Sequence, residues 1–453
     1  MKMQHRSAVM SLAMIMAFRM LGLFMILPVF SVHATTLTNA TVTLVGVALG
    51  IYGLTQAIFQ MPFGMLSDHI GRKPVIAAGL LLFAAGSVVA ALSHSIYGMI
   101  LGRALQGAGA IGSTALAMVA DLTRDENRSK AMAMIGLTIG SSFSIAMILG
   151  PIIFAWFHLS GIFWVTAGLG LIGLIILVII PSPAKVIPHP DIEMETGKFK
   201  SVFKNGQLVR LDWGIFSMHA MLMATFIAIP ILFTHTLGLS PTHQIITYLV
   251  VLVLAFSSMV PLIIIAEKKR KMKGIFLLAI FMLLVSQTLL FLLHDMAISI
   301  SILLFLFFAA FTLLEASLPS LVSKIAPIRY KGTAMGVYST SQFLGIFVGG
   351  SLGGLIFSHY GTHGIFLFCA LLALAWLIIA SSMKHPPYLS TLIFEASEKS
   401  TQVADELNHQ LKSIPGVAEV ALISAEKLIY LKVDRKIVDE NELRKVIEGV
   451  TLA

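Results

Sequence analysis

Long apolar runs follow one another along most of the chain, separated by short polar segments. A helix needs about 20 apolar residues to cross the hydrocarbon core of a membrane. The predicted membrane helices are residues 8–32, 40–66, 74–93, 97–120, 130–156, 160–180, 212–236, 243–266, 274–293, 296–324, 332–358 and 363–382. This pattern predicts an all-α polytopic membrane protein as far as residue 387.

A polar stretch at residues 181–211 divides these runs into two equal sets. It begins with four prolines and ends with mixed charges, which is typical of a linker. The fifth and eleventh runs begin at Arg128 and Arg329 with the same pattern, R-x-K-x-x-A-M, so the two sets echo each other. The predicted parts are a six-helix bundle (1–180), a cytoplasmic linker (181–211), a second six-helix bundle (212–387) and a separate domain (388–453).

The last 66 residues have a different composition, with more charges and alternating short apolar runs. The predicted order is a strand at 391–396, a helix at 397–413, strands at 417–423 and 428–433, a helix at 439–447 and a short last strand. The order β-α-β-β-α-β predicts an α+β, ferredoxin-like domain. It resembles heavy-metal-associated domains, but the first loop lacks their Cys pair, and Cys369 is the only cysteine. We therefore predict no metal and no cofactor. A cytoplasmic ligand or partner of this domain and a passive stabilising role both stay open.

Composition supports the membrane assignment. The chain is 57% hydrophobic and 12% charged, whereas soluble domains are about half apolar and a quarter charged. The net charge of +9 does not indicate nucleic-acid binding, because the basic residues form short clusters between apolar runs and no single stripe. The predicted surroundings are the lipid bilayer of the inner membrane.

Of the connections between the apolar runs, only alternate ones carry Lys or Arg residues. They are Lys2, Arg6, Arg72, Lys73, Arg124, Arg128, Lys130, Lys185, Lys198, Lys200, Lys204, Arg210, Lys268, Lys269, Arg270, Lys271, Lys273, Lys324, Arg329 and Lys331. Connections rich in Lys and Arg stay on the cytoplasmic side. The pattern predicts an even number of crossings with both termini in the cytoplasm.

The connection between the second and third runs carries a polar signature, G-x-L-x-D-x-x-G-R-K. Gly64 allows a neighbouring helix to approach closely. Asp68 can accept hydrogen bonds from a helix N-terminus, and Gly71 permits a sharp turn. Arg72 and Lys73 anchor the loop on the cytoplasmic side.

This signature resembles the loop motif of the major facilitator superfamily, and the resemblance covers residues 8–385. It implies a 12-helix major facilitator fold of two six-helix bundles, alternating access, and a loop that latches the two halves on the cytoplasmic face. The residues that carry over are Gly64, Asp68, Gly71, Arg72 and Lys73, with Asp121 and Arg128 as charge partners. The expected counterpart of Asp68 is the start of the eleventh run.

Two further motifs resemble those of proton-coupled members, in particular the drug:proton antiporter branch. Arg103 and Gln106 belong to R-x-x-Q-G-x-G in the fourth run, which is linked to proton transfer, although Arg103 could also be a snorkelling side chain. Gly150 and Pro151 resemble the fifth-helix antiporter motif, but its closing glycines are missing. A bent packing helix is the alternative there.

Ionisable residues inside a membrane are functional hypotheses by default. Glu315, deep in the tenth run, is the first candidate for a proton-coupling site, with a structural carboxylate as the alternative. Arg19, in the first run, is a candidate for binding an anionic substrate or neutralising a carboxylate. His219 joins it as a substrate-cavity candidate, and Asp212 lies in the same run as His219.

Small residues recur at four-residue spacing in the eleventh run, at Gly345, Gly349 and Gly353. Such a ridge allows tight helix packing. We expect it to pack against the second run, where Gly46 and Gly50 have the same spacing.

Three functional hypotheses remain open. They are proton-coupled export of a small molecule, proton-coupled uptake of a small anionic nutrient, and a sensor or assembly role with the C-terminal domain as output. The partners in the first two are protons and a small-molecule substrate of unknown identity. An enzyme is not expected, because the sequence shows neither a nucleophile–base pairing nor a nucleotide-binding loop.

Overall fold

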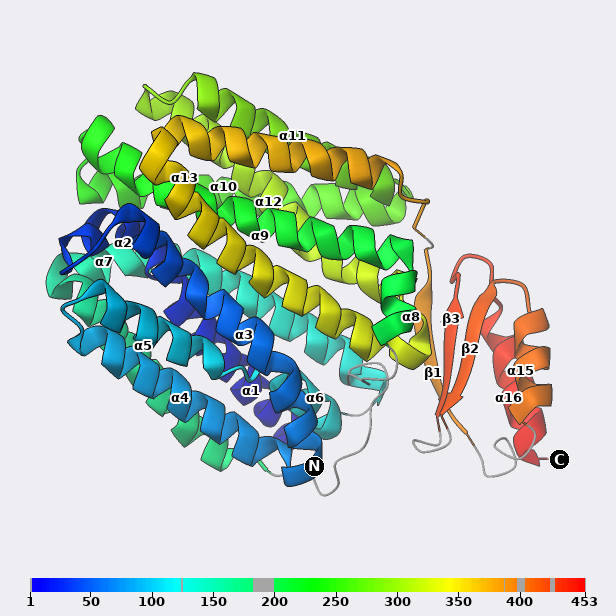
Figure 1. The fold of residues 1–453 in the computed structure, drawn as a ribbon. Coiled ribbons are helices and arrows are strands. Elements are labelled where there is room, and N and C mark those ends of the chain that lie inside the picture. The colour runs from blue at the N-terminus through cyan, green and yellow to red at the C-terminus, as the bar shows by residue number, and fades with distance from the viewer. Residues whose placement is uncertain are drawn as a thin grey trace.

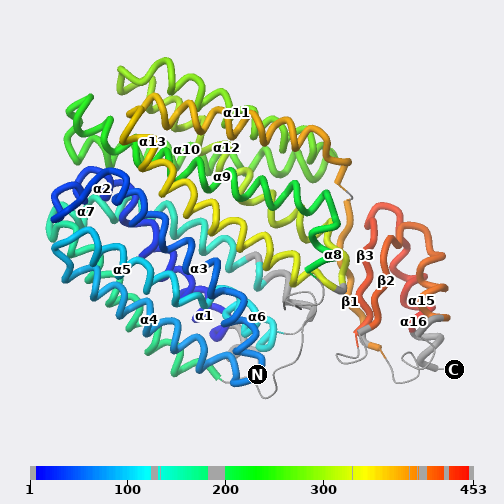
Figure 2. The backbone as a smooth tube through the Cα atoms, in the orientation of Figure 1, coloured from blue at the N-terminus to red at the C-terminus, as the bar shows by residue number. Residues whose placement is uncertain are grey.

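The structure is a computed structural model that describes residues 2–123, 125–181, 199–386, 388–396, 404–423 and 428–452. Two helical halves lie side by side, and a small α+β domain lies at one end of the second half (Figure 1). The tube view shows the same arrangement, with the sheet of the small domain beside the end of the second half (Figure 2).

The first half, residues 2–181, is built of helices. They are α1 (Lys2–Phe24), α2 (Leu27–His33), the 3-10 turn η1 (Ala34–Thr36), α3 (Val42–Ile70), α4 (Arg72–Leu92), α5 (Ile96–Ala108), α6 (Gly112–Leu122) and α7 (Asp125–Ile179).

The second half, residues 199–386, has a similar series. It contains α8 (Phe199–Lys204), α9 (Gly206–Ile231), the π-helical turn η3 (Leu232–Thr236), α10 (Pro241–Lys268), α11 (Met272–Leu292), α12 (Ala297–Ile325), the 3-10 turn η4 (Ile328–Tyr330) and α13 (Lys331–Ser381). Helix α8 and the start of α9 fall inside the stretch predicted as a linker. Residues 182–198 of that stretch lie outside the described residues.

Nine helical segments among the described residues are long and apolar enough to cross a membrane. Helices suit this task because all their backbone hydrogen bonds are made within one segment. Two of the nine, in α7 and α13, are interrupted by one residue with non-helical dihedral angles: His158 (φ 56°, ψ −165°) and Gly361 (φ 61°, ψ −154°). In Figure 1, α13 folds back there, from its yellow part to its orange part. The shared backbone angles at corresponding places indicate that the halves repeat one plan.

The loops that carry the basic clusters, α3–α4, α10–α11 and α12–α13, lie at one end of the bundle, which we call the basic end. The halves are joined by hydrogen bonds at the opposite end: Ser31 Oγ donates to Phe226 O (3.2 Å), and Thr43 Oγ1 donates to Ser358 Oγ (3.2 Å). Close backbone contact accompanies them, since a Cβ added at Gly46 would lie 2.3 Å from Gly350 O.

The small domain is formed by β1 (Ser390–Glu395), α15 (Ala404–Ser413), β2 (Val417–Ile423), β3 (Leu428–Val433) and α16 (Glu440–Leu452). The sheet order is β1-β3-β2, and both pairs are antiparallel. Three strands and two helices of the predicted order are therefore present. The short last strand is not found in the described residues, because α16 continues to Leu452 through the segment where that strand was expected.

Candidate functional site

The second half brings three polar side chains together inside the bundle, from α9, α12 and α13. Gln342 Nε2 lies 2.8 Å from His219 Nε2 and 3.4 Å from Glu315 Oε1. The other carboxylate oxygen, Glu315 Oε2, lies 3.8 Å from His219 Nε2. We call these three residues the proton cluster. It joins Glu315 and His219, which the sequence indicated separately, to Gln342, which the sequence analysis missed.

The hydrogen bonds of the imidazole determine where its proton lies. His219 Nδ1 is 3.3 Å from Ile215 O, so Nδ1 carries hydrogen and donates to that carbonyl. Nε2 of the neutral ring is then an acceptor for the Gln342 amide. The Gln342 amide also faces the carboxylate, so its two hydrogens serve both groups. A proton added to His219 Nε2 removes the acceptor that the Gln342 amide uses there, and the Gln342 side chain must then reorient.

Aromatic rings from both halves close the space next to this cluster. Phe311 lies one helical turn before Glu315 on α12, and its ring centroid is 5.9 Å from that of Phe143 on α7. Phe143 is also 5.9 Å from Phe308. His219 itself lies 5.7 Å from Phe311. The rings separate the cluster from the contacts at the opposite end, while the Glu315 side chain keeps 34% of its surface exposed.

The first half buries two guanidinium groups on either side of one tyrosine. Arg19 Nη2 donates to Tyr52 Oη (3.1 Å) and Gln56 Oε1 (2.9 Å). Arg103 stacks on the Tyr52 ring at 5.0 Å and donates to Gln106 Oε1 at 2.9 Å. Both arginines are completely buried.

Within the part of the chain that the structure describes, neither guanidinium is fully hydrogen-bonded: Nε and Nη1 of Arg19 and Nη2 of Arg103 are buried without a partner there. Buried charges are costly unless they are paired. Cation–π contacts with Phe83 (5.5 Å) and Tyr52 offset part of this cost. The Arg103–Gln106 pair is held by Ser87, which accepts a hydrogen bond from Gln106 Nε2 at 2.8 Å.

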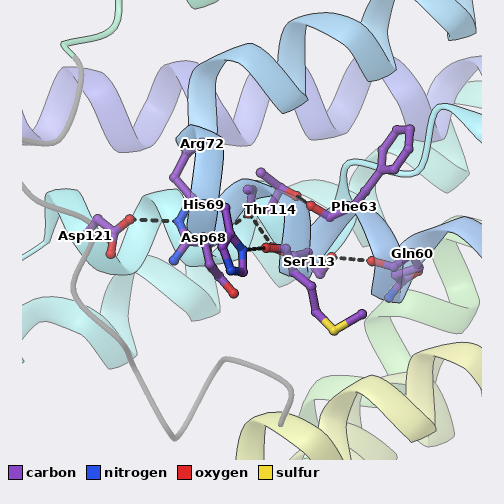
Figure 3. Close-up of polar contacts among 11 residues, drawn as sticks. Gln60, Phe63, Asp68, His69, Arg72, Ser113, Thr114 and Asp121 are labelled. Carbon is purple, nitrogen blue, oxygen red and sulfur yellow. Dashed lines mark hydrogen bonds and ion pairs between the residues drawn. The ribbon is translucent and has the colours of Figure 1, made fainter. Parts of the chain in front are cut away.

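The loop signature forms a compact cluster of charged side chains at the basic end, which we call the signature cluster (Figure 3). Gly71, at φ 96°, separates α3 from α4, a conformation that glycine adopts without strain. Arg72 is 2% exposed; its Nε donates to Asp121 Oδ2 (3.0 Å) and its Nη1 to Ser67 Oγ (2.8 Å). It also pairs with Asp68. Among the described residues, Asp68 contacts Arg72 and no group of α13.

Neighbouring helices hold the signature cluster in place. Ser113 on α6 donates to Gln60 O (3.0 Å), and a Cβ added at Gly64 would lie 3.1 Å from the Ser113 hydroxyl. Lys73 donates to two carbonyls at the end of α7, Val178 O (3.3 Å) and Ile180 O (2.6 Å). The side chain of Arg128 lies outside the described residues.

The glycine ridge of α13 packs differently from the expectation. Cβ atoms added at Gly345 and Gly349 would lie 2.3 and 2.2 Å from Phe216 O and Ala220 O of α9, within the same half. Gly353 likewise faces α9. The predicted pairing of this ridge with α3 is therefore wrong. The contact with α3 is made one residue further along, by Gly350 and Gly354, on another face of α13.

Gly150 and Pro151 lie where α7 passes the break between α1 and α2. A Cβ added at Gly150 would lie 2.0 Å from Met25 O, so the backbone of α7 touches the interruption of the first predicted span. Within the described residues, no group of three or more His, Cys, Asp or Glu side chains is arranged to hold a metal ion.

Comparisons with known proteins agree with this arrangement. The family described as Major Facilitator Superfamily matches residues 12–350, and a further match covers 321–425. The inner membrane transport protein YajR of Escherichia coli (strain K12) is 45% identical over 98% of this chain and 97% of that protein. The tetracycline resistance protein, class B, of Escherichia coli is 37% identical over 24% of this chain and 26% of that protein. The solved structure of the proton:xylose symporter XylE has a TM-score of 0.64 at 15% identity, covering 83% of this chain and 95% of that one, which is a likeness of fold.

Proposed function

Because the chain belongs to the Major Facilitator Superfamily, we propose that it is a proton-coupled secondary transporter that exports a small molecule by alternating access. The observation that carries this proposal is the proton cluster, in which a carboxylate and an imidazole share one amide. Both groups can take up a proton. With Gln342, they form a cluster of three residues on three helices of one half, next to the contact with the other half.

The cluster offers a physical link between protonation and movement. Gln342 must reorient when His219 gains a proton at Nε2, because that nitrogen then donates where it had accepted from the Gln342 amide. Gln342 belongs to α13, and the next residue, Phe343, touches α3 of the first half: a Cβ added at Gly53 would lie 2.4 Å from Phe343 O. Protonation therefore acts on the helix that joins the two halves.

The proposed topology has twelve crossings with the basic end in the cytoplasm. In this proposal α1 with α2, and α5 with α6, each make one crossing, while α7 and α13 each make two, divided at His158 and Gly361. The Lys and Arg bias of the loops supports this orientation and cytoplasmic termini. The small domain, proposed to be ferredoxin-like, then lies in the cytoplasm. Because the halves meet at the opposite end, the conformation described would be open to the cytoplasm.

Two observations support export. One is the local similarity to a tetracycline resistance protein. The other is the Gly150-Pro151 pair in α7, which touches the α1–α2 break as a bent antiporter-type helix would. Export against a gradient requires the coupling group to release its proton to the cytoplasm, and the exposed part of Glu315 suits this step.

A second candidate function is uptake of a small organic anion. It is favoured by Arg19, whose Nε and Nη1 are buried and have no hydrogen-bond partner among the described residues. The acids of the first half whose contacts are described, Asp68 and Asp121, pair with Arg72 at the basic end, far from Arg19 in the chain. A carboxylate on the substrate would supply the missing acceptor.

Flux measurements in proteoliposomes under an imposed pH gradient would test both candidates. The probes would be radiolabelled tetracycline and a panel of small carboxylates. Glu315→Gln should reduce gradient-driven flux about 100-fold while leaving exchange of labelled for unlabelled probe without a gradient. Asp295→Asn, at an exposed loop carboxylate, is the matched control and should change neither.

Gradient-driven flux that persists in Glu315→Gln would remove this residue from the coupling mechanism. An Arg19→Gln variant separates the substrate classes: a KM raised about tenfold for carboxylates alone would favour the anion. Equal KM values for all probes would leave Arg19 a structural role.

A further inference from the structure

The sheet of the small domain is covered on both faces, although the domain has helices on only one of them. Ile429, Leu431 and Val433 of β3 pack with α15 and α16. The alternate residues Leu428 and Tyr430 pack with Ile328, at the α12–α13 loop of the second half. All six residues of β3 are consequently buried. Because side chains alternate along a strand, one face of β3 forms the domain core and the other a docking surface.

Lys432, on this docking face, caps a helix of the membrane bundle. Its amine donates to Lys324 O (3.0 Å) and to Ala326 O at the C-terminus of α12. The last carbonyls of a helix have no partner within it and attract cations. Glu419 completes the contact, since its Oε1 accepts the Ile328 N–H (3.0 Å) and its Oε2 lies 3.7 Å from the Lys432 amine. The Lys432 side chain is 4% exposed.

Asp434 and Tyr388 hold the other basic loop of the second half, α10–α11. Arg270 Nη2 lies 2.5 and 2.8 Å from the two oxygens of Asp434, and its guanidinium stacks 5.3 Å from the Tyr388 ring. Met272 N–H, at the start of α11, donates to Tyr388 Oη (2.9 Å). Arg270 has φ 51°, which is unusual for a residue other than glycine. The contacts from outside the loop therefore stabilise a backbone turn that the loop sequence disfavours.

The first half also fixes a turn and caps a helix C-terminus at the basic end, and it does so with its own residues. There the α3–α4 turn is made by Gly71 and fixed by Arg72, and Lys73 caps the C-terminal carbonyls of α7. In the second half the corresponding turn lacks a glycine, and the cap for α12 comes from Lys432. Each half thus has one fixed turn and one capped helix at the basic end, supplied by different parts of the chain.

We infer that the small domain is a clamp that replaces the loop signature in the second half, fixing the α10–α11 and α12–α13 loops and with them the start of α13. Docking keeps the second half rigid at its basic end while the halves move relative to each other. The docking face is built for a partner within the same chain: Lys432 and Asp434 meet a helix C-terminus and an arginine, so the charges of the two surfaces are complementary.

Hydrogen exchange measured by mass spectrometry on the full chain tests the clamp without a substrate. The variants are Lys432→Met, which keeps the length of the side chain, and Asp434→Asn, which can still accept the Lys436 N–H but loses its charge. We expect amides 270–274 and 326–330 to exchange about tenfold faster in the double variant. Exchange in α4 and around Gly71 should not change.

Three controls make the result decisive. Exchange in β1, β3 and α15 must stay slow, which shows that the domain remains folded. Asp439→Asn alters a helix cap of the same domain away from the docking face and should leave both loops protected. Arg270→Gly should free the α10–α11 loop contact with Asp434 and keep its turn, since glycine adopts positive φ readily. Unchanged protection of both loops in the double variant, with the domain folded, would overturn the inference.

Discussion

The two halves share a backbone plan and bury opposite charges. The first half encloses Arg19 and Arg103 around Tyr52. The second half encloses Glu315 beside His219, and also Asp212, one of whose carboxylate oxygens has no partner in the described ranges. The shared backbone plan follows from the need to pack helices in lipid, and many sequences satisfy this need. Because a buried charge opposes stability, the difference between the halves is the basis on which we propose the functional residues.

The same division is visible in how helices contact each other. Gly349 packs α13 against α9 inside the second half, whereas Gly350, its neighbour, packs α13 against α3 of the first half. One face of α13 therefore packs within the second half, and the adjacent face makes the contact between the halves, which changes in the proposed alternating-access mechanism.

The largest expected effect comes from replacing Gly349 and Gly350, one at a time, by a larger residue. A Cβ at position 349 would lie 2.2 Å from Ala220 O, so Gly349→Val should destabilise the second half by about 3 kcal/mol. Gly350→Val meets Gly46 O at 2.8 Å and should leave both halves folded while forcing them apart at the opposite end. Thermal unfolding of the purified variants measures the first effect, and cysteine labelling from the opposite end the second. Equal loss of thermal stability in both variants would abolish the distinction between the faces.

The sequence determines the helices more completely than it determines their neighbours. Apolar length located the spans. Pro28, in the first turn of α2, is a local reason for the break of the first span, but the contact of Met25 with Gly150 of α7 is contained in no local pattern. The faces of α13 were assigned wrongly because Gly349 and Gly350 are adjacent, and both neighbouring helices need small residues there.

The candidate site shows the same limit. Glu315 and His219 could be found because ionisable residues are rare in apolar runs. Gln342 carries no charge and follows Ser341 in a run of small polar residues, so it did not stand out. Gln106 was found only because it belongs to the R-x-x-Q-G-x-G motif, and Gln342 belongs to no such motif. Tyr52, which separates Arg19 from Arg103, could not be identified, since three helices must be placed before that contact exists.

A moderate effect is expected from weakening the loop signature in the first half. Asp68 is the member of the signature cluster whose side chain, 30% exposed, can reach α13 when the basic end closes. Asp68→Asn removes its charge and should shift the balance about tenfold toward the form open at the basic end. Labelling of a cysteine at Gly112, where an added Cβ meets nothing within 4 Å, reports the shift in a background with Cys369 replaced.

The matched change in the second half is Glu267→Gln, which removes an ion pair with Lys324 (2.5 Å). Because the small domain also holds Lys324 O and Arg270, this variant should alter labelling much less than Asp68→Asn. An equal response in both variants would show that the two halves control the basic end in the same way, against the contrast drawn between signature and clamp.

The smallest expected effect is a pH dependence of docking by the small domain. Burial lowers the pKa of the docked Lys432 amine from 10.5 to about 8; Glu419 opposes this shift and Lys331 adds to it. When the domain is released, the amine is in water and regains its ordinary pKa. Between about pH 8 and 10.5 the amine is therefore mostly protonated in the released form and mostly neutral in the docked form. Raising the pH through this window therefore favours docking, by about threefold between pH 7.5 and 8.5. Spin labels at exposed Lys269 and Glu440 would follow the separation, and Lys432→Met should remove the dependence. Docking that weakens as the pH rises in this window would show that the charged amine, and not its burial, dominates the contact with α12.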